Sequence, residues 1–174
     1  MSALLEVESL SKKFGGLTAL SDLSFQVPAG AIVGVMGANG AGKTTLFSLI
    51  AGNTQPSHGD IRFDGRSIVG LSPDRVCRLG VARTFQIVKP FPAMTVRENL
   101  RTAAMFGHAQ LHTREAADAA TQSVLEEVGL AADAERPASA LTLSGQKRLE
   151  IARAVATGGR LVMLDGQLVD GVGP

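Results

Sequence analysis

Apolar and polar positions alternate in two stretches near the start of the chain, 4–10 and 23–27, which are separated by a Gly-Gly turn. A period of two is typical of strands with one buried face. The segment 31–36, Ala-Ile-Val-Gly-Val-Met, is almost wholly apolar, which is typical of a strand buried on both faces. A helix-forming stretch follows over 43–51. The sequence therefore predicts a buried strand, a glycine-rich loop and a helix in succession.

The middle of the chain changes from strands to helices. Alternation over 60–63 predicts one strand and the stretch 81–85 reads as another, and Ser72 followed by Pro73 predicts a short helix between them. From 90 to about 140, Ala, Glu and Leu dominate and strand patterns are absent. This composition predicts a helical region inserted into an α/β core.

Helices are predicted to begin at three places in that region and after it. Thr95 and Glu98 have the spacing of a capping box, so a helix should begin there. A second helix is predicted over about 113–128 and a third over 144–156, before an apolar strand at 161–164. One stripe of the second helix is expected to be buried, formed by Ala120, Val124 and Val128.

These elements suit one α/β domain in three regions. Residues 1–89 form a β region with the glycine-rich loop, 90–143 a helical subdomain, and 144–174 a helix followed by a strand. The length of 174 residues and the 45% hydrophobic content fit one domain rather than two.

Charge and cysteine content indicate which partners and which cellular compartment to expect. The formal net charge is +1 and the basic residues are scattered, so no nucleic-acid partner is expected. Cys77 is the only cysteine, which excludes an intrachain disulfide and fits a reducing cytosol. No apolar run approaches the roughly 18 residues of a spanning helix. A cytoplasmic protein is therefore expected.

The glycine-rich loop matches the G-x-x-x-x-G-K-[ST] pattern of a phosphate-binding loop. Backbone amides of such a loop replace the water around a polyphosphate, and glycines let the backbone approach it. Lys43 is predicted to reach the β- and γ-phosphates of ATP, Thr44 to ligate Mg²⁺, and Thr45 to line the site. The alternative is an accidental glycine-rich turn, against which the flanking strand and helix argue. The predicted loop comprises Gly37, Ala38, Asn39, Gly40, Ala41, Gly42, Lys43 and Thr44.

Asp165 ends the apolar strand at 161–164. A carboxylate in that position can hold Mg²⁺ through its water shell. An Asp at a strand end is otherwise a common turn former. The phosphate loop upstream favours the metal-binding interpretation.

Several runs of the sequence resemble the nucleotide-binding subunit of branched-chain amino acid ABC importers. These runs are 14–17, 37–45, 80–86 and 148–154. The resemblance implies a P-loop NTPase core of the ABC ATPase type with an inserted helical subdomain. It also implies an ATP-hydrolysing subunit that couples ATP and Mg²⁺ to transport, at the cytoplasmic face of the inner membrane. The expected partners are a membrane permease and a second ATP-binding subunit, identical or not.

The resemblance also assigns roles to single residues. Phe14 falls where an aromatic ring stacks on adenine, although such a Phe would otherwise be packing. Gln86 falls where a glutamine reaches Mg²⁺ and the attacking water, and the segment after it would face the permease. Ser144 and Gly145 fall in the signature turn that contacts the nucleotide on the opposite subunit. The register of that turn is open: a gapless count places Thr142 at the family's serine, whereas Ser144-Gly145-Gln146 reads as the motif with one glycine missing.

Two features depart from the family. The residue after Asp165 is Gly166, where the family has the glutamate that activates water. The chain also stops nine residues after Asp165, so the C-terminal part of the core is expected to be missing. The departures leave two alternatives to the importer subunit: a nucleotide-binding module that does not hydrolyse ATP, and a nonfunctional fragment of a truncated gene.

Overall fold

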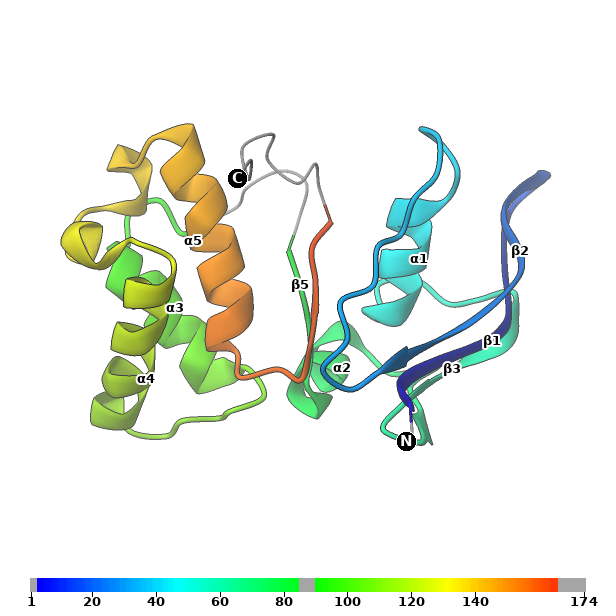
Figure 1. Ribbon diagram of the computed structural model, residues 1–174, viewed down its shortest axis with the longest axis horizontal. Coiled ribbons are helices and arrows are strands. Elements are labelled where there is room, and N and C mark those ends of the chain that lie inside the picture. Colours follow the sequence, from blue (N-terminus) through cyan, green and yellow to red (C-terminus); the bar gives the residue numbers. More distant parts are fainter. Residues whose placement is uncertain (1–2, 85–89, 166–174) are drawn as a thin grey trace. The chain divides into compact units, whose positions relative to one another are not determined.

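The computed structural model describes residues 3–84 and 90–165 of the chain. It divides into two compact units, Met1–Val76 and Cys77–Pro174. The first is built on a sheet and the second mainly on helices (Figure 1). The observed α/β elements agree with the predicted class.

The first unit contains a four-stranded antiparallel sheet in the order β2-β1-β3-β4. Strand β1 pairs with β2 on one side and with β3 on the other, and its buried side chains include Leu5, Val7 and Leu10. Helix α1 buries Leu46 and Leu49. The alternating stretches and the 60–63 segment are confirmed as strands. The elements are β1 (Ala3–Phe14), β2 (Leu17–Pro28), α1 (Lys43–Ile50), β3 (His58–Phe63), β4 (Arg66–Ser67) and α2 (Pro73–Leu79), of which α2 runs into the second unit.

The buried strand predicted over 31–36 is wrong. This segment has no strand conformation, and Ile32 and Met36 are 102% and 94% exposed. An apolar run forms an interior strand only when neighbouring strands pair with both of its edges. Within 3–84 and 90–165 no strand is hydrogen-bonded to it, and the four-stranded sheet is complete without it.

The second unit holds a parallel pair of short strands, β5 (Val81–Arg83) and β6 (Leu161–Met163). Arg83 lies opposite Met163 in the register. The strands predicted at 81–85 and 161–164 are therefore confirmed over Val81–Arg83 and Leu161–Met163, and Thr84 and Leu164 lie just beyond them.

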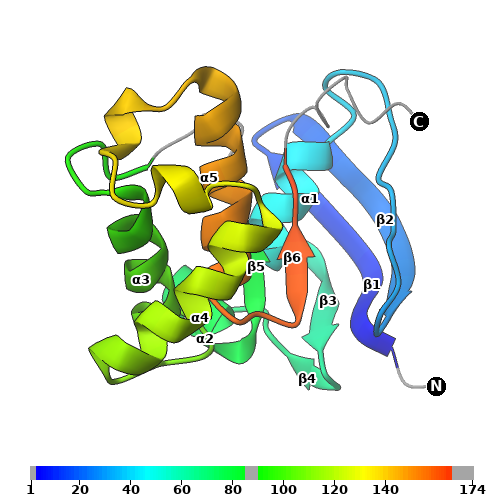
Figure 2. The ribbon, with the colours of Figure 1, turned by 60° about the vertical axis from the view of Figure 1, so that its left-hand side comes forward.

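Three helices pack together in the same unit (Figure 2). The predicted capping box is confirmed: the Glu98 amide donates to Thr95 Oγ1 at 3.1 Å, and the Thr95 amide donates to Glu98 Oε2 at 2.8 Å. The helices are α3 (Val96–Phe106), α4 (Arg114–Glu127) and α5 (Leu143–Ala156), with 3₁₀ turns η1 (Ala131–Asp133) and η2 (Ala138–Ala140) between α4 and α5. Their common core includes Leu100, Leu125, Leu130 and Leu149.

The buried stripe of α4 differs from the predicted one. Ala120 is exposed and Val128 only half-buried, so of the three expected residues only Val124 is buried. The polar residue Thr121 is part of the buried stripe. Its hydroxyl donates a hydrogen bond to the Ala117 carbonyl of the same helix at 2.6 Å, so the hydroxyl can be buried without losing its hydrogen bond. Counting apolar residues alone misses that position. The buried stripe is Ala117, Thr121, Val124 and Leu125.

Asn99 organises the chain segment before α3. Its side chain is fully buried and makes four hydrogen bonds to the backbone. Oδ1 accepts from the Phe91 amide at 2.8 Å, and Nδ2 donates to the carbonyls of Phe91, Met94 and Thr95. One amide side chain therefore fixes the loop that follows 85–89.

Replacing Asn99 with Ala should destabilise the chain strongly. The variant removes four hydrogen bonds, each with a net contribution of about 0.5–1.5 kcal/mol, so a loss of about 3 kcal/mol is expected. Urea unfolding followed by circular dichroism measures it. Thr102→Ala, on the same helix but with one exposed hydrogen bond, should change stability by less than about 0.5 kcal/mol. Equal effects of the two substitutions would refute the role of Asn99.

Among the described residues, no helix has the length and apolar character that crossing a bilayer requires.

Candidate functional site

The predicted phosphate loop lies in the first unit and leads into α1. The Lys43 ammonium donates to the carbonyls of Gly37 and Ala38 at 2.5 and 2.8 Å, so its side chain folds back over the loop. The Ala41 amide donates to the Ala38 carbonyl at 3.1 Å, which tightens the turn. The structure thus brings Lys43 and the loop backbone together, and its contact with the phosphates stays a prediction.

The start of α1 is suited to an anion. Gly42 is its N-cap residue, and no side chain caps the helix there. Helix N-termini carry a partial positive charge and unsatisfied amides that bind phosphate well. Thr44 is exposed and Thr45 half-buried in the first turn. Thr44, the predicted Mg²⁺ ligand, and Thr45, predicted to line the site, therefore both lie on the helical turn that follows the loop.

Gly42 is the position of the loop where only glycine fits. Its φ is +86°, and a Cβ there would lie 2.4 Å from the Ala19 carbonyl oxygen and 2.8 Å from the Leu20 side chain. Gly40 also has a positive φ, +83°, but a Cβ there would meet no atom within 4 Å. The two glycines therefore share a backbone conformation and differ in the space around them.

Gly42→Ala should destabilise the first unit by about 3 kcal/mol, since a left-handed conformation costs about 1–2 kcal/mol and overpacking adds about 1–3. Gly40→Ala is the matched control and should cost only the conformational part. Urea denaturation of both variants gives the difference. If the two substitutions cost the same, the close contact with strand β2 is not what requires glycine at 42.

Phe14 ends β1 and is 51% exposed. The Lys12 ammonium lies 4.8 Å from the centroid of its ring, a cation–π contact. An exposed ring at the end of a strand is available for stacking on a base. The contact with adenine stays a prediction.

Asp165 follows β6 and is buried, with 4% of its side chain exposed. Arg83 Nη2 donates to Asp165 Oδ2 at 2.6 Å, and the Asp165 amide donates to Thr84 Oγ1 at 3.1 Å. Both partners come from β5 and the residue after it. The carboxylate is therefore fixed by the neighbouring strand and paired with a cation. No role for Arg83 was predicted; the available signal was a charged residue within the predicted strand 81–85.

The signature region begins α5. Thr142 is the N-cap residue, and its hydroxyl accepts from the Gly145 amide at 3.2 Å. Ser and Thr are favoured at this position, and the register of the signature turn stays a prediction. Ser144 is exposed in the first turn and Gly145 is buried. The Gly145 amide already has a partner inside the helix.

Two predicted residues, Gln86 and Gly166, lie outside the described residues. The remaining candidates fall into two groups. Phe14 and the phosphate loop belong to the first unit, whereas Asp165, Ser144 and Gly145 belong to the second. The predicted site residues are therefore divided between the two units.

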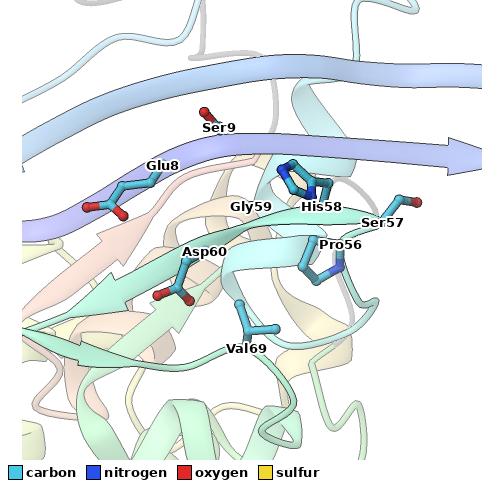
Figure 3. Close-up of a pocket in the computed structure, with 8 residues that line it drawn as sticks. All are labelled: Glu8, Ser9, Pro56, Ser57, His58, Gly59, Asp60 and Val69. Atoms are coloured by element: carbon cyan, nitrogen blue, oxygen red, sulfur yellow. The ribbon is translucent and has the colours of Figure 1, made fainter.

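A separate hollow of about 540 Å³ lies on the sheet of the first unit (Figure 3). Glu8 and Asp60 face each other there across β1 and β3. A hydrogen bond from the Ser67 hydroxyl lowers the pKa of Asp60, against a smaller opposing effect of burial. Two carboxylates repel a polyphosphate, and the hollow shares no residue with the phosphate loop. It is not the predicted nucleotide site.

A phosphate loop that opens a helix defines a nucleotide-binding protein of the P-loop class. The comparison with family models assigns the chain more narrowly: the ABC transporter model matches residues 20–168. The chain belongs to this family of ATPases. Its core and helical subdomain are therefore those of an ABC ATPase.

Named relatives agree with this assignment. The high-affinity branched-chain amino acid transport ATP-binding protein BraF of Pseudomonas aeruginosa is 42% identical to the chain. The protein of the same description from Escherichia coli, LivG, is 39% identical. Each match covers 93% of this chain and 68% of the relative. The similarity predicted with this type of subunit is confirmed.

Solved structures agree as well. An ATP-binding cassette of an ABC transporter, in a twinned crystal form, superposes with a TM-score of 0.82 at 28% identity. It is matched over 93% of this chain and 68% of its own length. The ADP conformation of the same cassette gives a TM-score of 0.79 at 27% identity with the same coverage. Nucleotide binding is therefore a property of a structural relative.

Proposed function

We propose that this chain binds ATP with Mg²⁺ and acts as the ATP-binding subunit of an importer for branched-chain amino acids. The observation that carries the proposal is the phosphate loop, in which the Lys43 ammonium lies against the carbonyls of Gly37 and Ala38 at the uncapped start of α1. The solute class comes from the descriptions of BraF and LivG.

The loop residues would take the phosphates. Lys43 would exchange its carbonyl contacts for β- and γ-phosphate oxygens, which are stronger partners because they are charged. The loop amides and the N-terminus of α1 would complete the cradle. Phe14 would stack on the adenine, since its ring is half exposed at the end of β1.

Mg²⁺ suits the oxygen donors of the chain. The Thr44 hydroxyl and the Asp165 carboxylate are hard ligands of the kind this ion prefers, and Gln86 is the third proposed ligand. Among residues 3–84 and 90–165, no cluster of three His, Cys, Asp or Glu could hold a metal by itself. Mg²⁺ in nucleotide sites is held mainly through nucleotide phosphates, with one or two protein oxygens. The bound ion would neutralise charge on those phosphates.

A membrane permease and a second ATP-binding subunit are the proposed partners, at the cytoplasmic face of the inner membrane. Ser144 and Gly145 would contact the nucleotide of the opposite subunit from the start of α5. The segment around Phe91, which Asn99 holds in place, would face the permease. Gln86 would orient the attacking water.

A second function is favoured by one feature of the sequence. Gly166 supplies no general base in the position where the family has glutamate. Such a base contributes typically about 10²–10⁴-fold to a rate. A module that binds ATP without consuming it is therefore the second candidate.

The importer role is tested with membrane vesicles that carry a leucine permease and lack their own ATP-binding subunits. Adding this chain and Mg·ATP should bring the chain to the vesicles and drive leucine uptake. Recruitment without uptake would favour the nonhydrolytic module. A chain that binds ATP and does not associate with the permease would refute the importer role.

A further inference from the structure

Arg83 and the proposed site residue Asp165 form a buried ion pair. The side chains are 10% and 4% exposed, and Nη2 lies 2.6 Å from Oδ2. Six ion pairs on β3 and in the helical region each have at least one side chain that is more than one fifth exposed. This pair therefore differs from the surface pairs of the helices.

The surroundings hold both partners in place. Arg83 is the last residue of β5, and β5 and β6 are parallel neighbours in register. The hydroxyl of Thr84, next to Arg83, accepts from the Asp165 amide. Residues at the end of β5 therefore contact both the backbone amide and the carboxylate of Asp165.

A buried carboxylate needs a positive partner, because removing a charge from water costs several kcal/mol when it is left unpaired. In the proposed function that partner is Mg²⁺, delivered with the nucleotide. The structure places a guanidinium at the same carboxylate. Arg83 and Mg²⁺ are both cations, so each weakens the attraction of Asp165 for the other.

We propose that Arg83 is a built-in counter-ion of Asp165, which orients and neutralises this carboxylate in the absence of metal and competes with Mg²⁺ for it. Arg83 is a positioning residue and touches no reacting atom. The effect of Arg83 on metal binding rests on the proposed function, in which Asp165 is a ligand of Mg²⁺. The pairing of Arg83 with Asp165 does not depend on the proposed function.

The pairing is tested first, in the full chain without nucleotide. Arg83→Gln, Asp165→Asn and the double variant are compared by urea unfolding. Each single variant should lower the ratio of folded to unfolded chain. The double variant should be at least about tenfold more folded than the two single effects predict together, because coupled neighbours are not additive. Additive effects would overturn the proposal whether or not the chain binds nucleotide.

The competition is tested by calorimetry of ADP binding, with Mg²⁺ and with a chelator in its place. The ratio of the two affinities reports the contribution of the metal. In Arg83→Gln this ratio should rise about tenfold above that of the parent, since a repelling charge is removed. In Arg83→Lys, which keeps the charge, it should stay near the parent ratio. An unchanged or smaller ratio in Arg83→Gln would overturn the competition.

Affinity for ADP in the chelator separates this inference from the proposed function. It depends on the phosphate loop and should be the same in the parent and both Arg83 variants. A parent chain that binds no ADP would refute the proposed function, and the unfolding comparison would still decide whether Arg83 and Asp165 are coupled.

Discussion

Replacing Lys43 with Ala should lower the affinity of the chain for ATP by about 10²–10⁴-fold. Two charge-assisted hydrogen bonds to phosphate oxygens are lost, each contributing about 1.5–3 kcal/mol. The folded structure should be little changed, because the present partners of Lys43 are two carbonyls of an exposed loop. Calorimetric titration with ATP measures the loss.

Lys13→Ala is the matched control for this substitution. Lys13 is an exposed lysine of the same unit, on β1, and lies outside the phosphate loop. Its removal should change ATP affinity less than about threefold, a difference typical of surface charges. If Lys43→Ala bound ATP as well as Lys13→Ala did, the loop would not be the nucleotide site.

The second large effect is expected from Gly166→Glu. This substitution places a carboxylate after Asp165, where the family resemblance implies the residue that activates water. A positioned general base should raise steady-state phosphate release by about 10²–10⁴-fold. Affinity for ATP should stay the same, since the base acts on the attacking water.

Gly166→Gln controls for size without supplying a base, so its turnover should stay at the parent level. A rise in both variants would indicate that bulk, rather than basicity, limits the parent. No rise in Gly166→Glu would favour the nonhydrolytic module, because the remaining catalytic groups would then be inadequate too.

Local signals in the sequence predicted most of the elements. The capping box at Thr95 involves residues three positions apart, and the structure contains both of its hydrogen bonds. The alternating strands of the first unit and the helix after the phosphate loop were predicted for the same reason. In each case the chemistry that decides the conformation lies within a few residues.

Features that depend on distant partners were not predicted. The 31–36 segment has the composition of an interior strand, but no described strand pairs with it. Arg83 and Asp165 are 82 positions apart, and their pairing follows from the register of β5 and β6. The role of Asn99 was missed because its four bonds go to backbone groups, which leave no pattern in the sequence.

The central claim is that the phosphate loop of this chain binds Mg·ATP, and thermal unfolding with and without that ligand tests it most directly. Ligand at about 100 times its Kd should add about 2.7 kcal/mol of stability. For a domain of this size the midpoint should then rise by about 5–10 °C, and Lys43→Ala should abolish the rise. A cooperative transition whose midpoint does not move with Mg·ATP would contradict the claim.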